Sequence, residues 1–331
     1  LDRLSGRYFA ADEEIVLSTS VGVALAPGDG HSAEALLQKA ELAASEAVES
    51  GGAIRFYGQS TPRVTERSRA ITRLLPNALS RGELELHYQP LVEGDSRKVA
   101  AAEALLRWNS PELGAVPPSE FVPLAEEIGL MVPIGGWVLR TACAQVRAWL
   151  DEGLSPSRVA VNVSLCQLVR GDLAEVVRDA LAESGVEPTI LEIELSERGV
   201  LRSDPEILRQ LHQIRELGVR LAIDDFGTGN SAVVYLKQFP IDILKIDQSF
   251  VRGVASCSED AAITSATIAM ARQLGLRVVA EGVESQEQLE FLQRHGCREY
   301  QGFLFSPAVP PEAFAALLRG GLGAAAGGER S

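Results

Sequence analysis

The sequence is short of the residues that build zinc sites and disulfide frameworks. Its 331 residues include only four cysteines and four histidines, and both types are scattered along the chain. No two cysteines form a Cys-x-x-Cys pair, so neither a zinc cluster nor a disulfide-stabilised fold is expected. This cysteine usage favours a reduced, cytoplasmic setting in which the cysteines serve as small core residues.

Long apolar runs are also absent. The most apolar stretch near the N-terminus, Glu14 to Pro27, is interrupted by Ser18, Thr19 and Ser20 and is too short to span a bilayer. We therefore expect no membrane contact by this fragment. The chain begins with Leu1 and no signal-peptide pattern follows, which predicts a piece of a longer protein whose remainder could carry a membrane anchor.

Positive charge is scarce as well. The formal net charge is −14, which argues against binding of long nucleic acids through a basic surface. A small anionic ligand stays compatible with this charge, because a bound cation can reverse the local field. In contrast, apolar residues are plentiful, at 46% of the chain, enough for a sizeable core.

The N-terminal residues predict a small α+β segment. Residues 14–25 are rich in β-branched types and predict a strand; Ser32 then caps a helix that ends at Gly51-Gly52, before a strand over 53–57. One helix on a few strands buries little, so residues 1–60 are expected to lack their other half. Residues 61–80 predict a helical connector in which Pro76 marks a kink or a helix start.

From Glu83 onward, apolar strands alternate with amphipathic helices, which favours a mostly parallel sheet covered by helices on both faces. The predicted strands are 84–92, 99–108, 158–163, 190–195, 219–225, 242–246, 277–281 and 299–303. The predicted helices are 119–127, 136–150, 172–184, 205–217, 260–274 and 286–294. Eight strands predict an α/β fold of the (β/α)8 TIM-like barrel type over residues 81–319. The connection at 93–98 is hairpin-short, so the first strand is expected to be antiparallel. The Gly/Ala-rich residues 320–331 predict a disordered tail.

Acidic, amide and amine side chains recur within these strands, at or near their carboxyl ends. They are Glu103, Asn162, Glu194, Asp224, Asp225, Lys245, Asp247, Glu281 and Gln301. In a parallel barrel those ends converge on one mouth, where barrel enzymes place their chemistry. Converging carboxylates cannot stay buried as bare ions, so they must take up protons or bind cations.

Oxygen donors without cysteine or clustered histidine select hard ions, Mg²⁺ or Mn²⁺. Five carboxylates and an amide suffice for two ions that share a bridging ligand, an arrangement suited to phosphodiester hydrolysis. A barrel with one metal ion that abstracts a proton beside a carboxylate, with Lys245 as the base, fits the same residues. The spacing of the residues does not separate these two hypotheses.

Eight motifs around these positions resemble the EAL family of cyclic di-GMP phosphodiesterases, in the same order, over about residues 80–318. They are YQPLV at 88–92, EALLRW at 103–108, NVS at 162–164, EIELSE at 192–197, DDFGTG at 224–229, LKID at 244–247, VVAEGVE at 278–284 and QGFLFS at 301–306. The resemblance implies a metal-dependent enzyme that opens cyclic di-GMP to linear pGpG, and a homodimer formed through the barrel.

The resemblance also implies roles for individual residues. One metal ion would be held by Glu103, Asn162, Glu194 and Asp224, and a second by Asp224, Asp225 and Glu281. Lys245 would engage the attacking water, which makes Lys245, Glu281 and Glu103 the expected catalytic residues. The expected substrate contacts are Arg107, Gln89, Gln301 and Asp247, and the expected loop-anchoring acids are Glu197 and Glu284.

Some residues depart from the family pattern. Asn230-Ser231-Ala232 replaces an aromatic residue and two serines in the loop whose position in the family couples metal occupancy to dimerisation, and Arg298 stands where an Asp is usual. Neither change removes a proposed ligand. A catalytically silent cyclic di-GMP receptor is the alternative function, and a regulatory scaffold without nucleotide binding is a third.

The first 60 residues resemble the C-terminal part of a GGDEF diguanylate cyclase domain. The resemblance rests on STSVGVALAPGDG at 18–30 and AIRFYG at 53–58. The signature turn of that domain does not occur in the chain, so no cyclase activity is expected from it.

Overall fold

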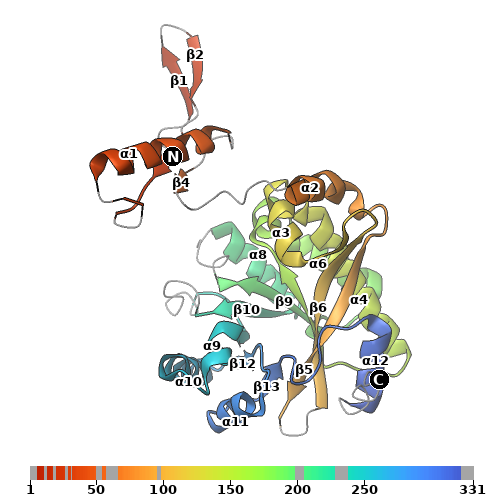
Figure 1. Ribbon diagram of the computed structural model, residues 1–331. Helices are drawn as coiled ribbons and strands as arrows, with labels where there is room; N and C mark the ends of the chain where they lie inside the picture. Colours follow the sequence, from red (N-terminus) through yellow and green to blue (C-terminus); the bar gives the residue numbers. More distant parts are fainter. Residues whose placement is uncertain are drawn as a thin grey trace. The chain divides into compact units, whose positions relative to one another are not determined.

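The computed structural model describes residues 6–10, 13–17, 20–26, 29–30, 32–49, 54–56, 66–94, 98–197, 205–227 and 238–321. The chain divides into two compact units, Leu1–Ala70 and Ile71–Ser331 (Figure 1). Two predicted features, the loop around Asn230 and the tail after residue 321, lie outside the described residues.

Within its described residues, the first unit contains four short strands, helix α1 (Ala33–Glu49) and the first residues of helix α2 (Glu66–Ala78). Strand β1 (Gly6–Ala10) pairs antiparallel with β2 (Glu13–Leu17), and β3 (Val21–Val23) pairs parallel with β4 (Ile54–Phe56). Helix α1 (Ala33–Glu49) connects β3 to β4 and packs on them. The segment from β3 to β4 is therefore a βαβ unit.

The prediction of one strand over 14–25 is wrong, because that stretch forms parts of two strands, β2 and β3, with different partners. The predicted helix cap is confirmed: the Ser32 hydroxyl accepts a hydrogen bond from the Ala35 amide at 3.2 Å. Gly22 of β3 permits a close approach to α1, because a Cβ atom there would lie 1.9 Å from the Ala40 carbonyl oxygen.

The second unit is a closed barrel of eight strands. The strands are β5 (Leu84–Glu93), β6 (Lys98–Ser110), β8 (Arg158–Val163), β9 (Leu191–Ser196), β10 (Arg220–Phe226), β11 (Ile243–Ile246), β12 (Arg277–Ala280) and β13 (Glu299–Gln301). Neighbours from β6 through β8 to β13 pair in parallel, and β5 closes the barrel by pairing antiparallel with both β6 and β13. The predicted barrel and its antiparallel first strand are confirmed. A ninth strand that the sequence did not predict, β7 (Gly114–Val116), forms a hairpin with β6.

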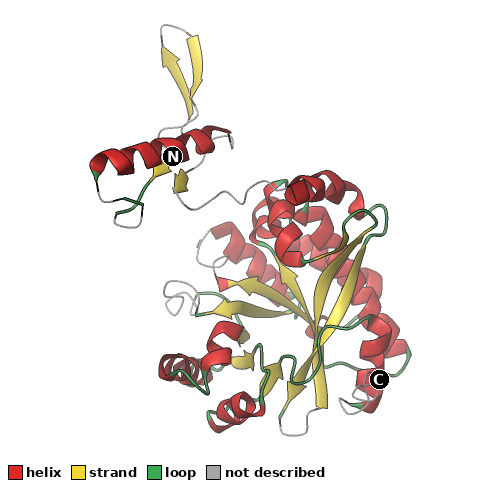
Figure 2. Cartoon of the chain, in the orientation of Figure 1, coloured by secondary structure: helices red, strands yellow, loops and turns green. Residues whose placement is uncertain are grey.

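Helices surround the barrel (Figure 2). They are α2 (Glu66–Ala78), α3 (Pro118–Glu127), α4 (Met131–Asp151), α5 (Leu165–Arg170), α6 (Leu173–Ser184), α8 (Pro205–Glu216), α9 (Gln248–Gly253), α10 (Ser258–Gln273), α11 (Gln286–Arg294) and α12 (Pro311–Gly320), with a 3₁₀ turn, η1, over Pro188–Ile190. No helix starts at Pro76, which lies in the last turn of α2. The helices named from the sequence do not include the short helices α5 and α9, or α12. No described helix combines the length and the hydropathy of a membrane span.

The barrel interior is built in layers, because alternate side chains of each strand face inward. The middle layer is a small apolar cluster of Leu91, Ala101, Ala222, Ile243 and Val279. A much larger apolar cluster fills the space between the strands and the helices. Two of the four cysteines, Cys143 and Cys297, are buried, whereas Cys166 and Cys257 are only partly buried, so the expected core role holds for the first two.

Below the apolar layer, at the amino ends of the parallel strands, lies a buried ionic cluster. Arg158 is 1% exposed; its Nε lies 2.5 Å from Glu192 Oε2, and its Nη2 pairs with Glu299. Burial lowers the pKa of Arg158, but the charges of Glu192 and Glu299 outweigh it and raise the pKa. This cluster joins β8, β9 and β13 across the barrel floor, and breaking one partner would leave an unpaired buried charge.

Candidate metal centre

The residues that the sequence placed at the barrel mouth do converge there. They come from the middle of the long strand β6, from the carboxyl-terminal halves of β8 to β11 and from the segment that follows β12: Glu103, Asn162, Glu194, Asp224, Lys245 and Glu281. Residues two apart in a strand face the same side. The apolar layer contains Ala101, Ala222, Ile243 and Val279. The residues two positions further along the chain, Glu103, Asp224, Lys245 and Glu281, therefore lie directly above that layer.

Lys245 is the centre of this group and is fully buried. Its ammonium Nζ lies 2.6 Å from Glu281 Oε1 and 2.7 Å from Glu194 Oε1. Carboxylate oxygens of Glu103 and Asp224 each lie 3.5 Å away. Burial lowers the pKa of Lys245, but the surrounding charges, that of Asp224 first, outweigh it and raise the pKa well above its usual value. The side chain therefore stays an ammonium.

Amide groups hold the Glu103 carboxylate from two sides. Asn162 Nδ2 and Gln301 Nε2 each donate a hydrogen bond to it at 2.6 Å. Burial raises the pKa of Glu103, but the Lys245 charge and these hydrogen bonds together bring it below its usual value. Because Asn162 uses its nitrogen here, its Oδ1 is left as an oxygen donor for a cation.

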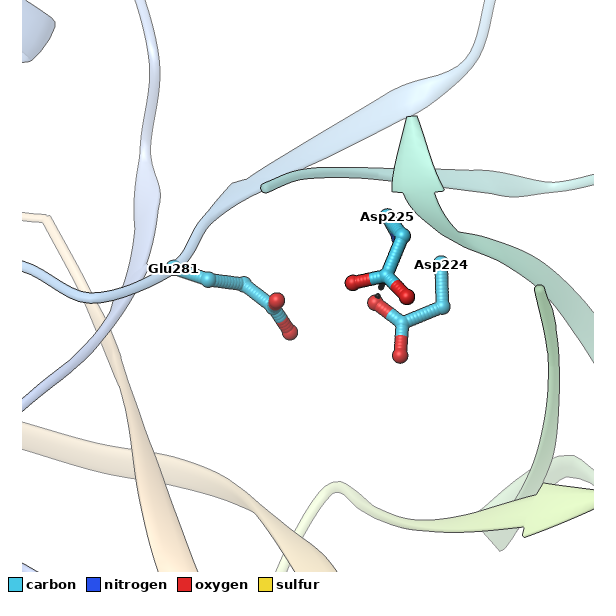
Figure 3. A group of neighbouring side chains, drawn as sticks. All are labelled: Asp224, Asp225 and Glu281. Atoms are coloured by element: carbon cyan, nitrogen blue, oxygen red, sulfur yellow. Dashed lines mark hydrogen bonds between the residues drawn. The ribbon is translucent and has the colours of Figure 1, made fainter. Parts of the chain in front are cut away.

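The carboxylates of Asp224, Asp225 and Glu281 face one another (Figure 3). One oxygen each from Asp224, Asp225 and Glu281 lies within 4.8 Å of the others. Asp225 has φ 55°, and among the described residues it is the only one other than glycine with positive φ. This strained backbone lets two consecutive residues offer carboxylates to one point, and strain of this kind is typical of functional sites.

The charges of these acids repel one another. Burial, followed by the charge of Asp224 among others, raises the pKa of Glu281 to about 8 against the opposing effect of Lys245. Burial and the neighbouring carboxylates of Asp224 and Asp247 raise the pKa of Asp225 to about 6. Burial and the charge of Glu103 raise the pKa of Glu194 well above its usual value. One ammonium does not neutralise the cluster.

The donor set fits divalent cations. Glu194 Oε2 is buried and accepts no hydrogen bond from any residue that the structure describes. An unpartnered buried carboxylate oxygen is costly, and a cation beside it would remove that cost. All donors are carboxylate or amide oxygens, which suit Mg²⁺ or Mn²⁺ better than zinc.

The other predicted contacts are distributed around the cluster. Gln301 also donates to Gln89 Oε1 at 3.0 Å, and Gln89 donates to the Ser306 carbonyl at 3.2 Å, so the two amides form a chain leading to Glu103. Arg107 lines a cavity beside the acids, where its Nη1 donates to the Leu106 carbonyl at 2.9 Å.

Three predicted residues lie at the edge of the site. Asp247 caps α9, accepting a hydrogen bond from the Ser249 amide at 3.0 Å. Glu197 is buried and accepts from the Gly227 amide at 2.8 Å, directly after β10. Glu284 is exposed and lies 3.8 Å from Arg252 of α9. The loop-anchoring role of Glu197 and Glu284 stays a prediction, because residues 228–237 lie outside the described part of the chain.

Two cavities flank the acidic cluster and share Leu105 and Asp224. One, of about 200 Å³, is lined by Gln89, Glu103, Leu105, Asp224, Gln248, Glu281, Gly282, Glu284, Gln301, Gly302 and Phe303. The other, of about 430 Å³, adds Arg107 and Asn162 to an apolar wall that includes Val122, Pro123, Met131 and Val138. An elongated ligand can therefore lie across the acids, with apolar parts on both sides.

Sequence reasoning missed Phe303, whose side chain is 70% exposed beside the acids. The signal was available, because an aromatic residue directly follows Gln301-Gly302 after β13. It also missed the Arg158 cluster below the apolar layer, although the strand alternation places Glu192 two residues before Glu194 on the same inward face.

Comparison with known proteins gives one family. The family model described as the EAL domain matches residues 72–308. The chain is 42% identical over 311 residues to the bifunctional diguanylate cyclase/cyclic di-GMP phosphodiesterase MucR of Pseudomonas aeruginosa, and 39% identical over 304 residues to the cyclic di-GMP phosphodiesterase PdeR of Escherichia coli. These alignments span 94% and 91% of the chain but only 45% of either relative, so the chain covers less than half of their length.

Solved structures of related proteins have the same fold as this chain. The phosphodiesterase of P. aeruginosa MucR, in complex with c-di-GMP, superposes with a TM-score of 0.71 at 45% identity, over 74% of this chain and 99% of that one. The EAL domain of Mycobacterium smegmatis DcpA gives a TM-score of 0.62 at 37% identity, over 72% and 97%.

Proposed function

The chain belongs to the EAL-domain family, and from this premise we propose that it hydrolyses cyclic di-GMP to linear pGpG. The observation that carries the proposal is the convergence of four carboxylates on the buried Lys245 ammonium at the barrel mouth, with the Asp225 carboxylate beside two of them. The relatives named as cyclic di-GMP phosphodiesterases, and the solved complex of one of them with c-di-GMP, support the choice of substrate.

The proposed cofactor is a pair of Mg²⁺ or Mn²⁺ ions. Glu103, Asn162, Glu194 and Asp224 would hold one ion, and Asp224, Asp225 and Glu281 the other. When bound, such ions polarise the phosphodiester and lower the pKa of water. The support for this proposal is the excess of buried carboxylates and the unpartnered Glu194 Oε2.

Side chains of the protein would then position the attacking water and the substrate. The Lys245 ammonium, which already bridges Glu194 and Glu281, donates a hydrogen bond to the attacking water and stabilises charge that develops on the phosphate. A bond forms between the water oxygen and phosphorus, and the bond from phosphorus to the 3′-oxygen breaks. In the overall step the attacking water loses one proton and the leaving 3′-oxygen takes one up. Arg107 pairs with the second phosphate, for which a guanidinium fork is suited. Gln89, Gln301 and Asp247 contact the substrate or position the side chains beside it.

The experiment is turnover of cyclic di-GMP by this chain, with pGpG followed by chromatography, in the presence of Mn²⁺ or Mg²⁺ and in EDTA. Product that appears only with the metal supports the proposal. Measurable binding of cyclic di-GMP without product would replace it with the silent receptor, and the absence of both binding and product would overturn it.

Phe303 is expected to contribute to substrate binding rather than to chemistry. Its exposed ring lines the smaller cavity, where a guanine base can stack on it. Because stacking of a base on an aromatic side chain contributes about 1–3 kcal/mol, Phe303→Ala should raise KM by about 5- to 150-fold with kcat little changed. Steady-state kinetics would test this, with Ile263→Ala on α10 as an exposed apolar control. A reduced kcat at unchanged KM would contradict the stacking role.

We also propose that residues 1–60 are the C-terminal part of a GGDEF-like domain, followed by a connector over 61–80, the barrel over 81–319 and a tail over 320–331. The βαβ unit from β3 to β4 and the alignment with MucR across 94% of the chain support this division. A cytoplasmic location and a homodimer complete the proposal; the free cysteines suit a reducing compartment. Sedimentation of the chain with and without cyclic di-GMP would test the dimer.

A further inference from the structure

A cavity of about 530 Å³ opens at the end of the barrel opposite the acidic cluster. It lies where β12 and β13 begin, beside α10. Its lining consists of Glu93, Ile268, Arg272, Leu276, Arg277, Val278, Gly296, Arg298 and Glu299. None of these residues lines either cavity at the mouth, and the apolar layer that contains Val279 lies between the two ends. This cavity is therefore separate from the proposed active site.

Three arginines give the cavity an excess of positive charge. Arg277 Nη1 lies 3.7 Å from Glu299 Oε1, but Glu299 is already paired with the buried Arg158. The guanidinium groups of Arg272 and Arg298 form no hydrogen bond or ion pair with any side chain in the described part of the chain. The protein has a net charge of −14, so it contains more than enough acidic residues to pair with both arginines, yet neither arginine is paired with one among the residues that the structure describes.

The surroundings reinforce this positive field. Burial, and then the charges of Arg277 and Arg158, lower the pKa of the neighbouring Arg220. Glu93 and Glu299 also line the cavity, and Glu299 is shared between Arg277 and Arg158, so the positive charges outnumber the negative ones and an anion in the cavity would stabilise the group.

The rest of the lining is apolar. Ile268, Leu276 and Val278 provide a wall beside the arginines, and the volume lies in the range of pockets that bind small organic molecules. Guanidinium groups recognise phosphate through paired hydrogen bonds. We propose that this cavity binds a small phosphorylated ligand, with its phosphate groups on Arg272 and Arg298 and its organic part against the apolar wall.

Calorimetric titration tests this proposal with pyrophosphate, ATP and GTP as the probes, in EDTA to suppress metal-dependent binding at the mouth. We expect saturable one-to-one binding, weakened about tenfold or more by Arg298→Glu and by Arg272→Glu, because each change removes a charge-assisted contact. Arg178→Glu on α6 makes the same charge change on an exposed arginine that does not line the cavity, and should leave affinity unchanged. Nucleotides that bind more tightly than pyrophosphate would show that the apolar wall contributes, whereas equal affinities would identify the phosphate groups alone as the ligand.

The milder variant Arg298→Ala removes the guanidinium without adding negative charge and keeps the test valid if a charge reversal impairs folding. Turnover of cyclic di-GMP should be unchanged in every folded variant, since neither arginine belongs to the proposed catalytic machinery. Arg298→Ala should not lower the melting temperature, because it removes one positive charge from a cavity with an excess of them. Absence of saturable binding, or binding that the Arg272 and Arg298 variants retain at full strength, would overturn the proposal. Because binding is measured without turnover, this result does not depend on the proposed hydrolysis.

Discussion

Replacement of Glu103 by glutamine is expected to lower kcat/KM for cyclic di-GMP by about 10³-fold or more, since each 1.4 kcal/mol of lost transition-state stabilisation costs about tenfold in rate. The Glu103 carboxylate is held in position by Asn162 and Gln301 and lies 3.5 Å from Lys245. Glutamine keeps the size of the side chain but loses the negative charge that a metal ligand must supply. The measurement is steady-state turnover across a series of Mn²⁺ concentrations.

The fold should survive this change. Because Lys245 and two hydrogen bonds bring the pKa of Glu103 below its usual value, the fold stabilises this charge, and the reduced repulsion on Glu194 and Glu281 offsets its loss only in part. We expect the melting temperature in EDTA to shift slightly downward, with the variant still folded. Glu287→Gln, the same substitution on an exposed position of α11, should leave turnover intact. Full activity in the Glu103 variant would remove this residue from the proposed site.

Replacement of Lys245 by methionine should lower kcat by about 10²- to 10⁴-fold, the usual range for a group that assists proton transfer or stabilises developing charge, with a much smaller change in KM. The ammonium contacts carboxylates of Glu281 and Glu194 and would face the attacking water rather than the bases of the substrate. Single-turnover measurements at saturating substrate separate the chemical step from binding.

The Lys245 variant should also depend on metal for its stability. Without the ammonium, the buried carboxylates lose their only neutralising partner among the described residues of the cluster, which destabilises the metal-free fold. Added Mn²⁺ should therefore raise the melting temperature of this variant more than that of the unmodified protein. Lys98→Met, at the exposed start of β6, is the matched control. A kcat equal to that of the unmodified protein would exclude the proposed role of Lys245.

The barrel could be predicted from the sequence because the apolar runs of its strands and the amphipathic pattern of its helices both depend on residues that are close together in the chain. Continuous apolar runs such as 158–163 and 242–246 each match an observed strand to within one residue, and the short link after Glu93 required an antiparallel first strand. The errors arose where pairing partners, not periodicity, decide the structure. The stretch 14–25 has uniform β propensity, yet its two halves pair with different strands. Pro76 fits the last turn of α2 because a helix can accommodate it there, which the residue alone does not reveal.

The site residues were also accessible from the sequence, because the polar residues that interrupt apolar strands at their carboxyl ends must meet at one mouth. Phe303 was not predicted, since an aromatic residue after a buried strand more often packs than lies exposed. The strained backbone of Asp225 likewise has no sequence signal, because its φ of 55° depends on how β10 ends.

The sequence by itself determined the order of the elements, the barrel type and the set of acids, amides and lysine at its mouth. Only the tertiary structure decided that Lys245 is fully buried among four carboxylates, that Arg158 joins two glutamates below the apolar layer, and that Arg272, Arg277 and Arg298 surround one cavity. The physical reason is distance along the chain. Alternation within a strand is fixed by neighbours two residues apart, whereas pKa values, ion pairs and cavities arise between strands and helices that closure of the barrel brings together.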